Sequence, residues 1–356
     1  MIKLLHRLEL WLVSTIFALG LTVVDSIIRR VRMSHNTGIV GKGRITIVKN
    51  PLFPANDFFT PGRQFPCRLR HAAVSYPDNA ALQVFGASLK FADTDSKSPL
   101  DIEMNTGTTS LFWNATTFLA FARYQATNGW VTFRPYYKKY PPGLPAAKSG
   151  VRLRPSSFAL LRYHSQTPTW FKSTDGTNYY VKYRLVPEDL SQPETGIPSA
   201  ERLDRVWDAQ PEQVEVPDRT YLMDEYTARV LGKPVIYRLQ LQLHKVSPDD
   251  SPEICNSNKE WLEETHPWME LATVEISSIG TWDEAVLTRT SPANAPSSLQ
   301  IIEAYSLDDY NSLNYMRAKT RVTRNTRALM DKIFGVPKRP SGARELGAGP
   351  NNAVDT

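Results

Sequence analysis

The sequence predicts an α+β domain in which antiparallel strands are joined by turns and helices are added. Residues 234–244 alternate apolar and polar side chains with the period of two that a half-buried strand requires, and residues 271–279 form a second such segment. Residues 308–334 instead form the strongest predicted helix. Strands and helices of this kind pack in layers around a shared core.

The remaining elements follow in order along the chain. Residues 44–107 are predicted to be strands broken by turns, with a proline-bearing arm that we expect to be irregular. Further strands are expected at 159–171 and 179–186, and helices at 116–125, 199–207 and 220–231. Residues 138–157 are rich in proline and should form a loop. The tail, residues 336–356, should be disordered.

The composition is that of a folded protein with one large domain or two ordinary ones. The chain has 356 residues, of which 41% are hydrophobic and 22% charged, so a core can be buried. The net charge of +6 allows attraction to anionic lipid, a carboxylate substrate or nucleic acid. The basic C-terminal third has no aromatic platform beside it, so nucleic-acid binding is not expected.

The cysteines and histidines do not indicate a metal centre. Cys67 and Cys255 lie far apart and in no zinc-ligand spacing, so we expect two free thiols. The six histidines are spread singly, so no clustered metal site is predicted.

Residues 1–32 contain an apolar run from Leu8 to Ile28 that has basic residues on both sides. The run is marginal for a membrane span, which needs about 20 predominantly apolar residues, and it has no cleavage site of the secretory type. Two interpretations stay open: a helix that anchors the protein at a membrane, and a helix that packs on the domain. We therefore expect a membrane-associated or cytoplasmic protein, and the segment gives no evidence of secretion.

A histidine and an asparagine form the candidate catalytic pair. His35 follows the hydroxyl residue Ser34 and precedes a predicted strand, whereas Asn105 lies at the end of another strand. Such a pair can bind and polarise a peroxide; the alternative is that His35 only stabilises a turn with Ser34 and Asn36. On the predicted helix 116–125, Phe118 can form the wall of a flat cofactor or belong to the core.

These residues lie in a series of segments that resembles the catalase-related family, most closely its small branch typified by coral allene oxide synthase. The similar segments extend in order along the chain: Ser34-His35 with Gly38, Ile45-Thr46-Ile47-Val48, Phe58-Phe59-Thr60-Pro61-Gly62-Arg63, Arg68-Leu69-Arg70-His71-Ala72, Met104-Asn105-Thr106-Gly107, Glu264-Thr265-His266-Pro267-Trp268 and Asp309-Tyr310-Asn311-Ser312. The resemblance implies a catalase-type antiparallel β-barrel with added helices over residues 33–335.

The resemblance also implies haem as cofactor and assigns roles to individual residues. His35 and Asn105 correspond to the distal pair, and Ser34 lies where this branch has a threonine that restrains the histidine. Arg32 and Arg70 correspond to arginines that meet haem propionates. Arg317 corresponds to an arginine of the proximal helix, and the family's iron-ligating tyrosine, four residues later, is replaced by Arg321. A guanidinium stays protonated and has no lone pair for iron.

Two hypotheses about function follow. In the first, the chain is a haem enzyme that acts on a fatty-acid hydroperoxide as a lyase, dehydratase or peroxidase. In the second, it kept the barrel but lost the iron, and serves as a lipid-binding or assembly subunit at a membrane. The sequence does not predict the oligomeric state.

Overall fold

The structure is a computed structural model that describes residues 2–128, 133–206 and 218–340. The end of the helix expected at 199–207 and residues 341–356 of the predicted tail lie outside the described residues. Within the described part of the tail, the Pro337 carbonyl accepts a hydrogen bond from Trp282 Nε1 (2.6 Å), and Arg339 pairs with Asp224.

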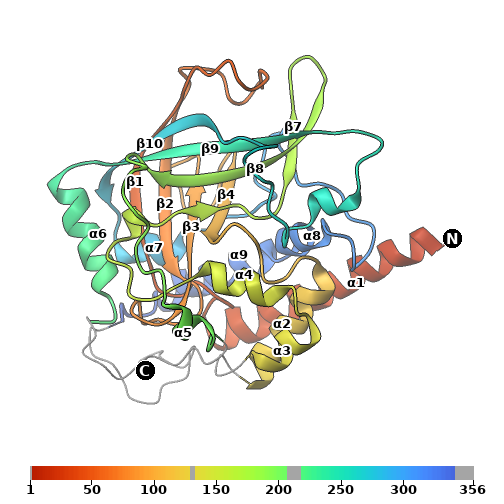
Figure 1. Cartoon of the computed structure of the whole chain (residues 1–356). Coiled ribbons are helices and arrows are strands. Elements are labelled where there is room, and N and C mark those ends of the chain that lie inside the picture. The colour runs from red at the N-terminus through yellow and green to blue at the C-terminus, as the bar shows by residue number, and fades with distance from the viewer. Residues whose placement is uncertain (1, 129–132, 207–217, 341–356) are drawn as a thin grey trace.

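A closed antiparallel barrel of eight strands forms the centre of the molecule (Figure 1). The spatial order is β2-β1-β10-β9-β8-β6-β4-β3, and the barrel closes because β3 also pairs with β2. The strands are β1 (Gly38–Ile47), β2 (Gln64–Ala73), β3 (Gln83–Lys90), β4 (Asp101–Thr106), β6 (Tyr163–His164), β8 (Asn178–Pro187), β9 (Val235–Lys245) and β10 (Met269–Ile279). The short strands β5 (Val151–Arg152) and β7 (Thr169–Lys172) extend the sheet.

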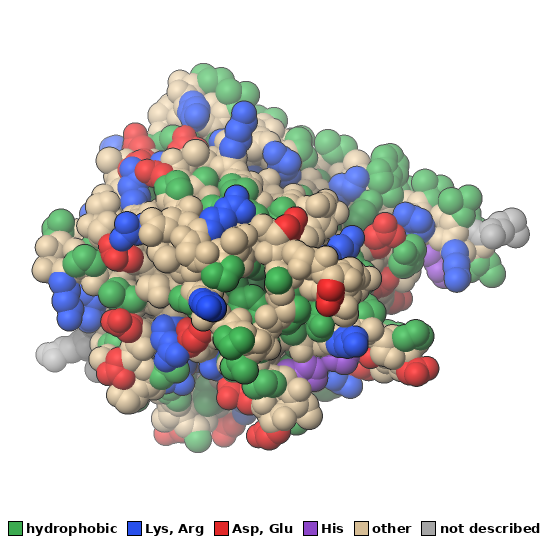
Figure 2. All heavy atoms as spheres, turned by 90° about the horizontal axis from the view of Figure 1, so that it is seen from above, with side chains coloured by type: hydrophobic (Ala, Val, Ile, Leu, Met, Phe, Trp, Pro, Cys, Tyr) green, Lys and Arg blue, Asp and Glu red, His purple; other side chains and the backbone are tan. Residues whose placement is uncertain are grey.

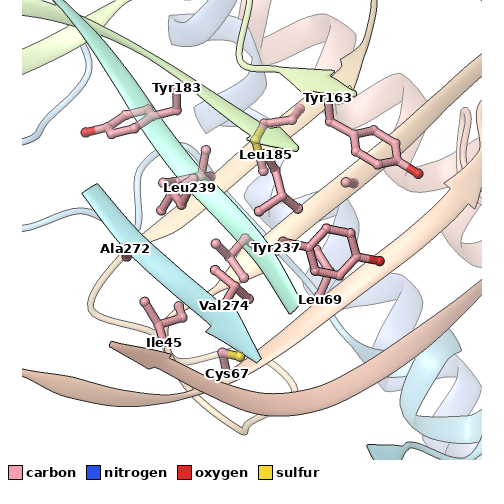
Figure 3. Close-up of a cluster of buried hydrophobic side chains, with 14 of the residues drawn as sticks. Ile45, Cys67, Leu69, Tyr163, Tyr183, Leu185, Tyr237, Leu239, Ala272 and Val274 are labelled. Carbon is pink, nitrogen blue, oxygen red and sulfur yellow. The ribbon is translucent and has the colours of Figure 1, made fainter. Parts of the chain in front are cut away.

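Alternation along each strand separates the barrel interior from its outer face. Figure 3 shows interior side chains from several strands in contact, among them Ile45 of β1, Leu69 of β2 and Val274 of β10, all buried. The intervening side chains point outward. On β4, Ile102 and Met104 belong to this core, so Glu103 and Asn105 face the layer of helices outside the barrel.

The helices pack around the lower part of the barrel in Figure 1. Helix α1 (Ile2–Leu21) continues into the π-helix η1 (Thr22–Ile28), which contacts α9. The others are α2 (Ala115–Asn128), α3 (Arg134–Lys139), α4 (Gly143–Gly150), α5 (Ala200–Leu203), α6 (Tyr221–Gly232), α7 (Trp282–Leu287), α8 (Ser312–Lys319) and α9 (Arg321–Phe334). Two 3₁₀ turns, η2 (Phe158–Leu160) and η3 (Pro252–Cys255), complete the elements described here.

Three expected elements differ from the structure. The loop predicted at 138–157 contains α4, because Pro145 lies in the first turn, where its missing N–H costs nothing. The strand predicted at 159–171 is instead a 3₁₀ turn and two short strands, since Pro168 and the positive φ of Gln166 interrupt the extended chain. The single helix predicted at 308–334 breaks at Thr320, whose hydroxyl donates to the Arg317 carbonyl (2.9 Å).

Candidate functional site

A cavity of about 320 Å³ lies between the outer face of the barrel and the helices. Strands β2, β3 and β4 supply one wall through outward-facing residues such as Arg70, Ser88 and Asn105. Residues of α1, η1, α2, α8 and α9 supply the others, and the segment that precedes β1 places His35 in the cavity. The volume is in the range of small-molecule sites.

His35 and Asn105, predicted as a pair from the sequence, meet in this cavity. His35 Nε2 lies 3.4 Å from Asn105 Oδ1, and Ser34 Oγ lies 2.8 Å from His35 Nδ1. Because Oδ1 only accepts, the tautomer that satisfies both contacts carries its proton on Nε2 and accepts the Ser34 hydroxyl at Nδ1. Burial lowers the pKa of His35 to about 4, with a further contribution from the Arg70 guanidinium, so the ring is neutral at pH 7.

Gly86, which sequence analysis did not select, allows this approach. It pairs with Asn105 across β3 and β4, and a Cβ atom at this position would lie 2.6 Å from His35 Nε2. His35 itself adopts a left-handed φ of 63°, which non-glycine residues rarely hold. Its backbone is fixed by a hydrogen bond from its N–H to the Val74 carbonyl (3.0 Å). Only the fold identifies Gly86, because its role depends on the packing of an imidazole against the strand.

Arg32 and Arg70, which the resemblance assigns to haem propionates, line the cavity, and both donate to carbonyls of α7 or of the residue that follows it. Arg70 Nε donates to Ala285 O (2.8 Å) and its Nη2 to His35 O (2.9 Å). Arg32 Nη2 donates to Val286 O (2.7 Å) and Thr288 O (2.9 Å). Among the described residues, neither forms an ion pair with a carboxylate.

Burial lowers the pKa of Arg70 to about 9 and that of Arg32 well below its ordinary value, and neighbouring arginines add to both shifts. Buried cations held without a carboxylate are costly unless a ligand supplies the anion. The lining residues include more arginines than acids: Arg32, Arg70, Arg317, Arg324 and Arg327 against Asp25 and Glu103. The cavity is therefore suited to a ligand that carries negative charge.

Glu103 is the acid that sequence analysis missed. Its carboxylate accepts from Arg317 and from Thr290 Oγ1 (2.7 Å), and the guanidiniums of Arg317 and Arg324 outweigh burial and hold its pKa at about 2. The strand period gives the signal that could have found it, because a residue two positions before Asn105 must share its face. Arg317, selected from the resemblance, is therefore in the cavity but already has an anionic partner.

Comparison with known proteins identifies the family. No family model matches the chain. The chain is 40% identical over 309 residues to the allene oxide synthase-lipoxygenase protein of Plexaura homomalla. The matched region covers 85% of this chain and 28% of that protein. It is 25% identical over 304 residues to linolenate 9R-lipoxygenase of a Nostoc species, covering 80% of this chain and 37% of that protein. The chain thus spans well under half of the length of these two relatives.

Solved catalases share the fold. A bacterial catalase superposes with a TM-score of 0.63 at 15% identity, covering 87% of this chain and 60% of the other. Catalase A of Saccharomyces cerevisiae gives a TM-score of 0.62 at 13% identity, covering 91% and 70%. The chain is a catalase-related protein of the allene oxide synthase-like branch. Its α+β barrel with added helices is the catalase-type fold predicted from the sequence.

The side of the cavity formed by α8, Thr320 and α9, here called the α8–α9 wall, departs from the expected iron site. Arg321 is exposed, whereas its neighbour Thr320 lines the cavity, because the chain changes direction between the two helices. Among the described residues that line the cavity there is neither a tyrosine nor a cysteine. Phe118 does line it, and packs edge-on against Phe17 and Phe112.

Proposed function

We propose that this catalase-related protein binds a carboxylated organic hydroperoxide of the fatty-acid type in the cavity, without haem iron. The observation that carries the proposal is the single cavity that holds both the His35–Asn105 pair and an excess of arginines over acids. The name of the coral relative supports the ligand class, because a lipoxygenase forms a fatty-acid hydroperoxide and an allene oxide synthase consumes one.

The distal pair offers complementary groups to a peroxide. Its contact of 3.4 Å is long for a hydrogen bond, so a ligand oxygen can replace it at little cost. The neutral His35 ring donates from Nε2 to a peroxide oxygen, and Asn105 Oδ1 accepts the O–OH hydrogen. The Ser34 hydroxyl keeps the ring in the tautomer that this arrangement needs.

The carboxylate of the ligand requires a different environment from its peroxide. A carboxylate can take the hydrogen bonds of Arg70 and Arg32 in exchange for carbonyl partners, and each charge-assisted bond contributes about 1.5–3 kcal/mol. Apolar lining residues such as Phe17, Leu21 and Phe118 offer contacts to the acyl chain. One amphipathic molecule therefore matches the distribution of charge and apolar surface in the cavity.

Haem fits only part of this site. The distal pair, the buried arginines and Phe118 are residues that would suit a haem ring and its propionates. The α8–α9 wall presents Thr320, Arg317 and Arg324, and none of these is an anionic ligand for ferric iron. The residues present therefore do not form a tyrosinate-ligated haem site, and we derive no reaction step through iron.

The second candidate is the haem-dependent hydroperoxide lyase or dehydratase that the resemblance implies. The His35–Asn105 pair supports it as well, since a protein that only binds fatty acids does not need a peroxide-polarising pair. The two candidates differ in one property, the content of haem.

Calorimetric titration of the haem-free protein tests the proposal with matched ligands. A C18 hydroperoxy fatty acid should bind about tenfold more tightly than its parent fatty acid, because the peroxide gains hydrogen bonds from the distal pair. Its methyl ester should bind about 10- to 100-fold more weakly than the acid. In Asn105→Leu the preference for the peroxide should vanish while the preference for the acid stays. Equal affinity for all three ligands in wild type would contradict the proposal.

A further inference from the structure

The N-terminal helix turns its polar face toward the protein and its apolar face outward. The buried residues of α1 and η1 are mostly small or polar, and include Ser14, Thr22, Asp25 and Ser26. The exposed residues include Lys3, His6, Arg7 and Glu9, but most of them are large and apolar: Ile2, Leu4, Leu5, Leu8, Trp11, Leu12, Ile16, Leu19, Val23, Val24, Ile27 and Ile28. A surface helix in water shows the reverse arrangement, so this face is built for contact with something apolar.

Hydrogen bonds fix the helix in this orientation. Thr22 Oγ1 donates to Thr323 Oγ1 of α9 (3.1 Å), and Ser26 Oγ donates to the Thr323 carbonyl (2.8 Å). The Thr323 hydroxyl in turn donates to Ala18 O (3.1 Å). Small and hydroxyl residues that bond across helices are the contacts by which helices associate inside a membrane. The outward position of the apolar face is therefore determined by specific packing against α9.

Helix α9, which packs against η1, also exposes apolar residues. Its exposed residues include Leu329, Ile333 and Phe334, and the Arg30 guanidinium at the end of η1 lies 5.9 Å from the Phe334 ring centroid. We call the exposed apolar residues of α1, η1 and α9 the apolar face. Figure 2 shows hydrophobic side chains along the arm of α1 that projects from the body of the molecule, with basic side chains among them.

The surroundings of the apolar face are basic. Within α1 and α9 the exposed cations are Lys3, Arg7, Arg321 and Lys332. The acids of these two helices are Glu9, which is exposed, and Asp331, which is buried and paired with Arg327. Apolar side chains with cations beside them match a bilayer surface that contains anionic headgroups.

We propose that the apolar face docks the protein in the plane of an anionic lipid bilayer. The helix Ile2–Ile28 has 27 residues, which is long enough to cross a membrane. However, its buried residues extend from Leu10 to Ser26, so roughly 24 Å of the helix is packed against the protein. A perpendicular span would strip this packed face from α9, whereas an in-plane position keeps it.

This docking places the cavity beside the membrane. Phe17, Leu21, Asp25 and Ser26, on the inner side of the helix, line the cavity. Only α1 and η1 then separate the bilayer from the ligand site. If the proposed function is correct, on which this step rests, the acyl ligand is taken directly from the membrane.

Flotation of the full-length protein with vesicles tests the docking. Wild type should float with vesicles of phosphatidylcholine and phosphatidylserine, and should bind less well to phosphatidylcholine alone. The triple variant Leu12→Gln, Ile16→Gln and Leu19→Gln should partition at least about 100-fold more weakly, because three aliphatic side chains lose their apolar partner. The matched control replaces exposed leucines elsewhere on the surface, Leu52 and Leu231, by Gln, and should float like wild type.

A second measurement keeps the proposal testable if the triple variant does not fold. Trp11 is exposed within the apolar face, so acyl-brominated lipids should quench wild type more than Trp11→Phe, and shallow bromines more than deep ones. Wild type that stays unbound, or a triple variant that floats as well as wild type, would overturn the proposal. A dimer in solution that the triple variant abolishes, without vesicle binding, would assign the face to a second copy instead. Failure of the ligand titrations alone would leave the docking result intact.

Discussion

His71→Phe should make the folded protein less sensitive to acid. His71 lies inside the barrel on β2, fully buried, with its ring stacked on Phe158 and its Nε2 3.1 Å from the Tyr237 hydroxyl. The groups around it are aromatic, and burial alone lowers its pKa to about 3. In the unfolded chain the same imidazole has its ordinary pKa of about 6.5. As the pH falls below 6.5, the unfolded state therefore binds a proton that the folded state does not bind, and the free energy of unfolding decreases.

The magnitude follows from these two pKa values. At pH 5 the proton stabilises the unfolded chain by about 2 kcal/mol, and at pH 8 by almost nothing. His71→Phe removes this difference, and it leaves the Tyr237 hydroxyl bonded to that of Tyr226 (3.1 Å). Urea unfolding at pH 8 and pH 5 should thus show a loss of stability about 2 kcal/mol smaller in the variant than in wild type.

The control for this measurement is His6→Phe, because His6 is exposed on α1. It should retain the full acid sensitivity of wild type. If His71→Phe and wild type lose the same free energy of unfolding between pH 8 and pH 5, the burial of a neutral His71 is refuted.

Two further predictions test the site and the barrel. Gly86→Ala should displace His35 and, in the same titrations, reduce the preference for the hydroperoxide over the parent fatty acid about tenfold. The control is Gly232→Ala, which should leave this preference unchanged because the space around the Gly232 Cβ position is open. Asp101→Asn leaves the buried Lys90 ammonium, 3.1 Å away, without its carboxylate, and should lower the free energy of unfolding by about 3–5 kcal/mol. The control is Asp204→Asn, which breaks an exposed pair with Lys148 and should lower the free energy of unfolding by less than about 1 kcal/mol. A similar loss of stability in both variants would contradict the argument.

Periodicity predicted the long elements because burial on one face determines them. Strands β8, β9 and β10 and helices α2 and α6 lie close to the ranges expected from alternation or helical spacing. The two cysteines are free, as their separation indicated. Short strands such as β6 carry too few residues to show a period, and β6 forms because β4 and β8 pair with it.

The cavity was only partly predictable from the sequence. The resemblance selected His35, Asn105 and Arg70, and all three line one cavity. Glu103 and Gly86 were missed because their roles depend on neighbours across the sheet and not on adjacent residues. The side chains that α8 and α9 present to the cavity depend on the break between these helices at Thr320. There the Thr320 hydroxyl competes with backbone N–H groups for the Arg317 carbonyl.

The absorption spectrum of the purified protein after titration with haem tests the central claim, a hydroperoxide site without a tyrosinate ligand for iron, most directly. Wild type should give no stoichiometric Soret band of a tyrosinate-ligated ferric centre, because Thr320 and not a phenol faces the cavity. Thr320→Tyr should gain that band, whereas Arg321→Tyr, whose side chain points to solvent, should resemble wild type. A near-stoichiometric haem band in wild type would contradict the account and favour the haem-dependent enzyme.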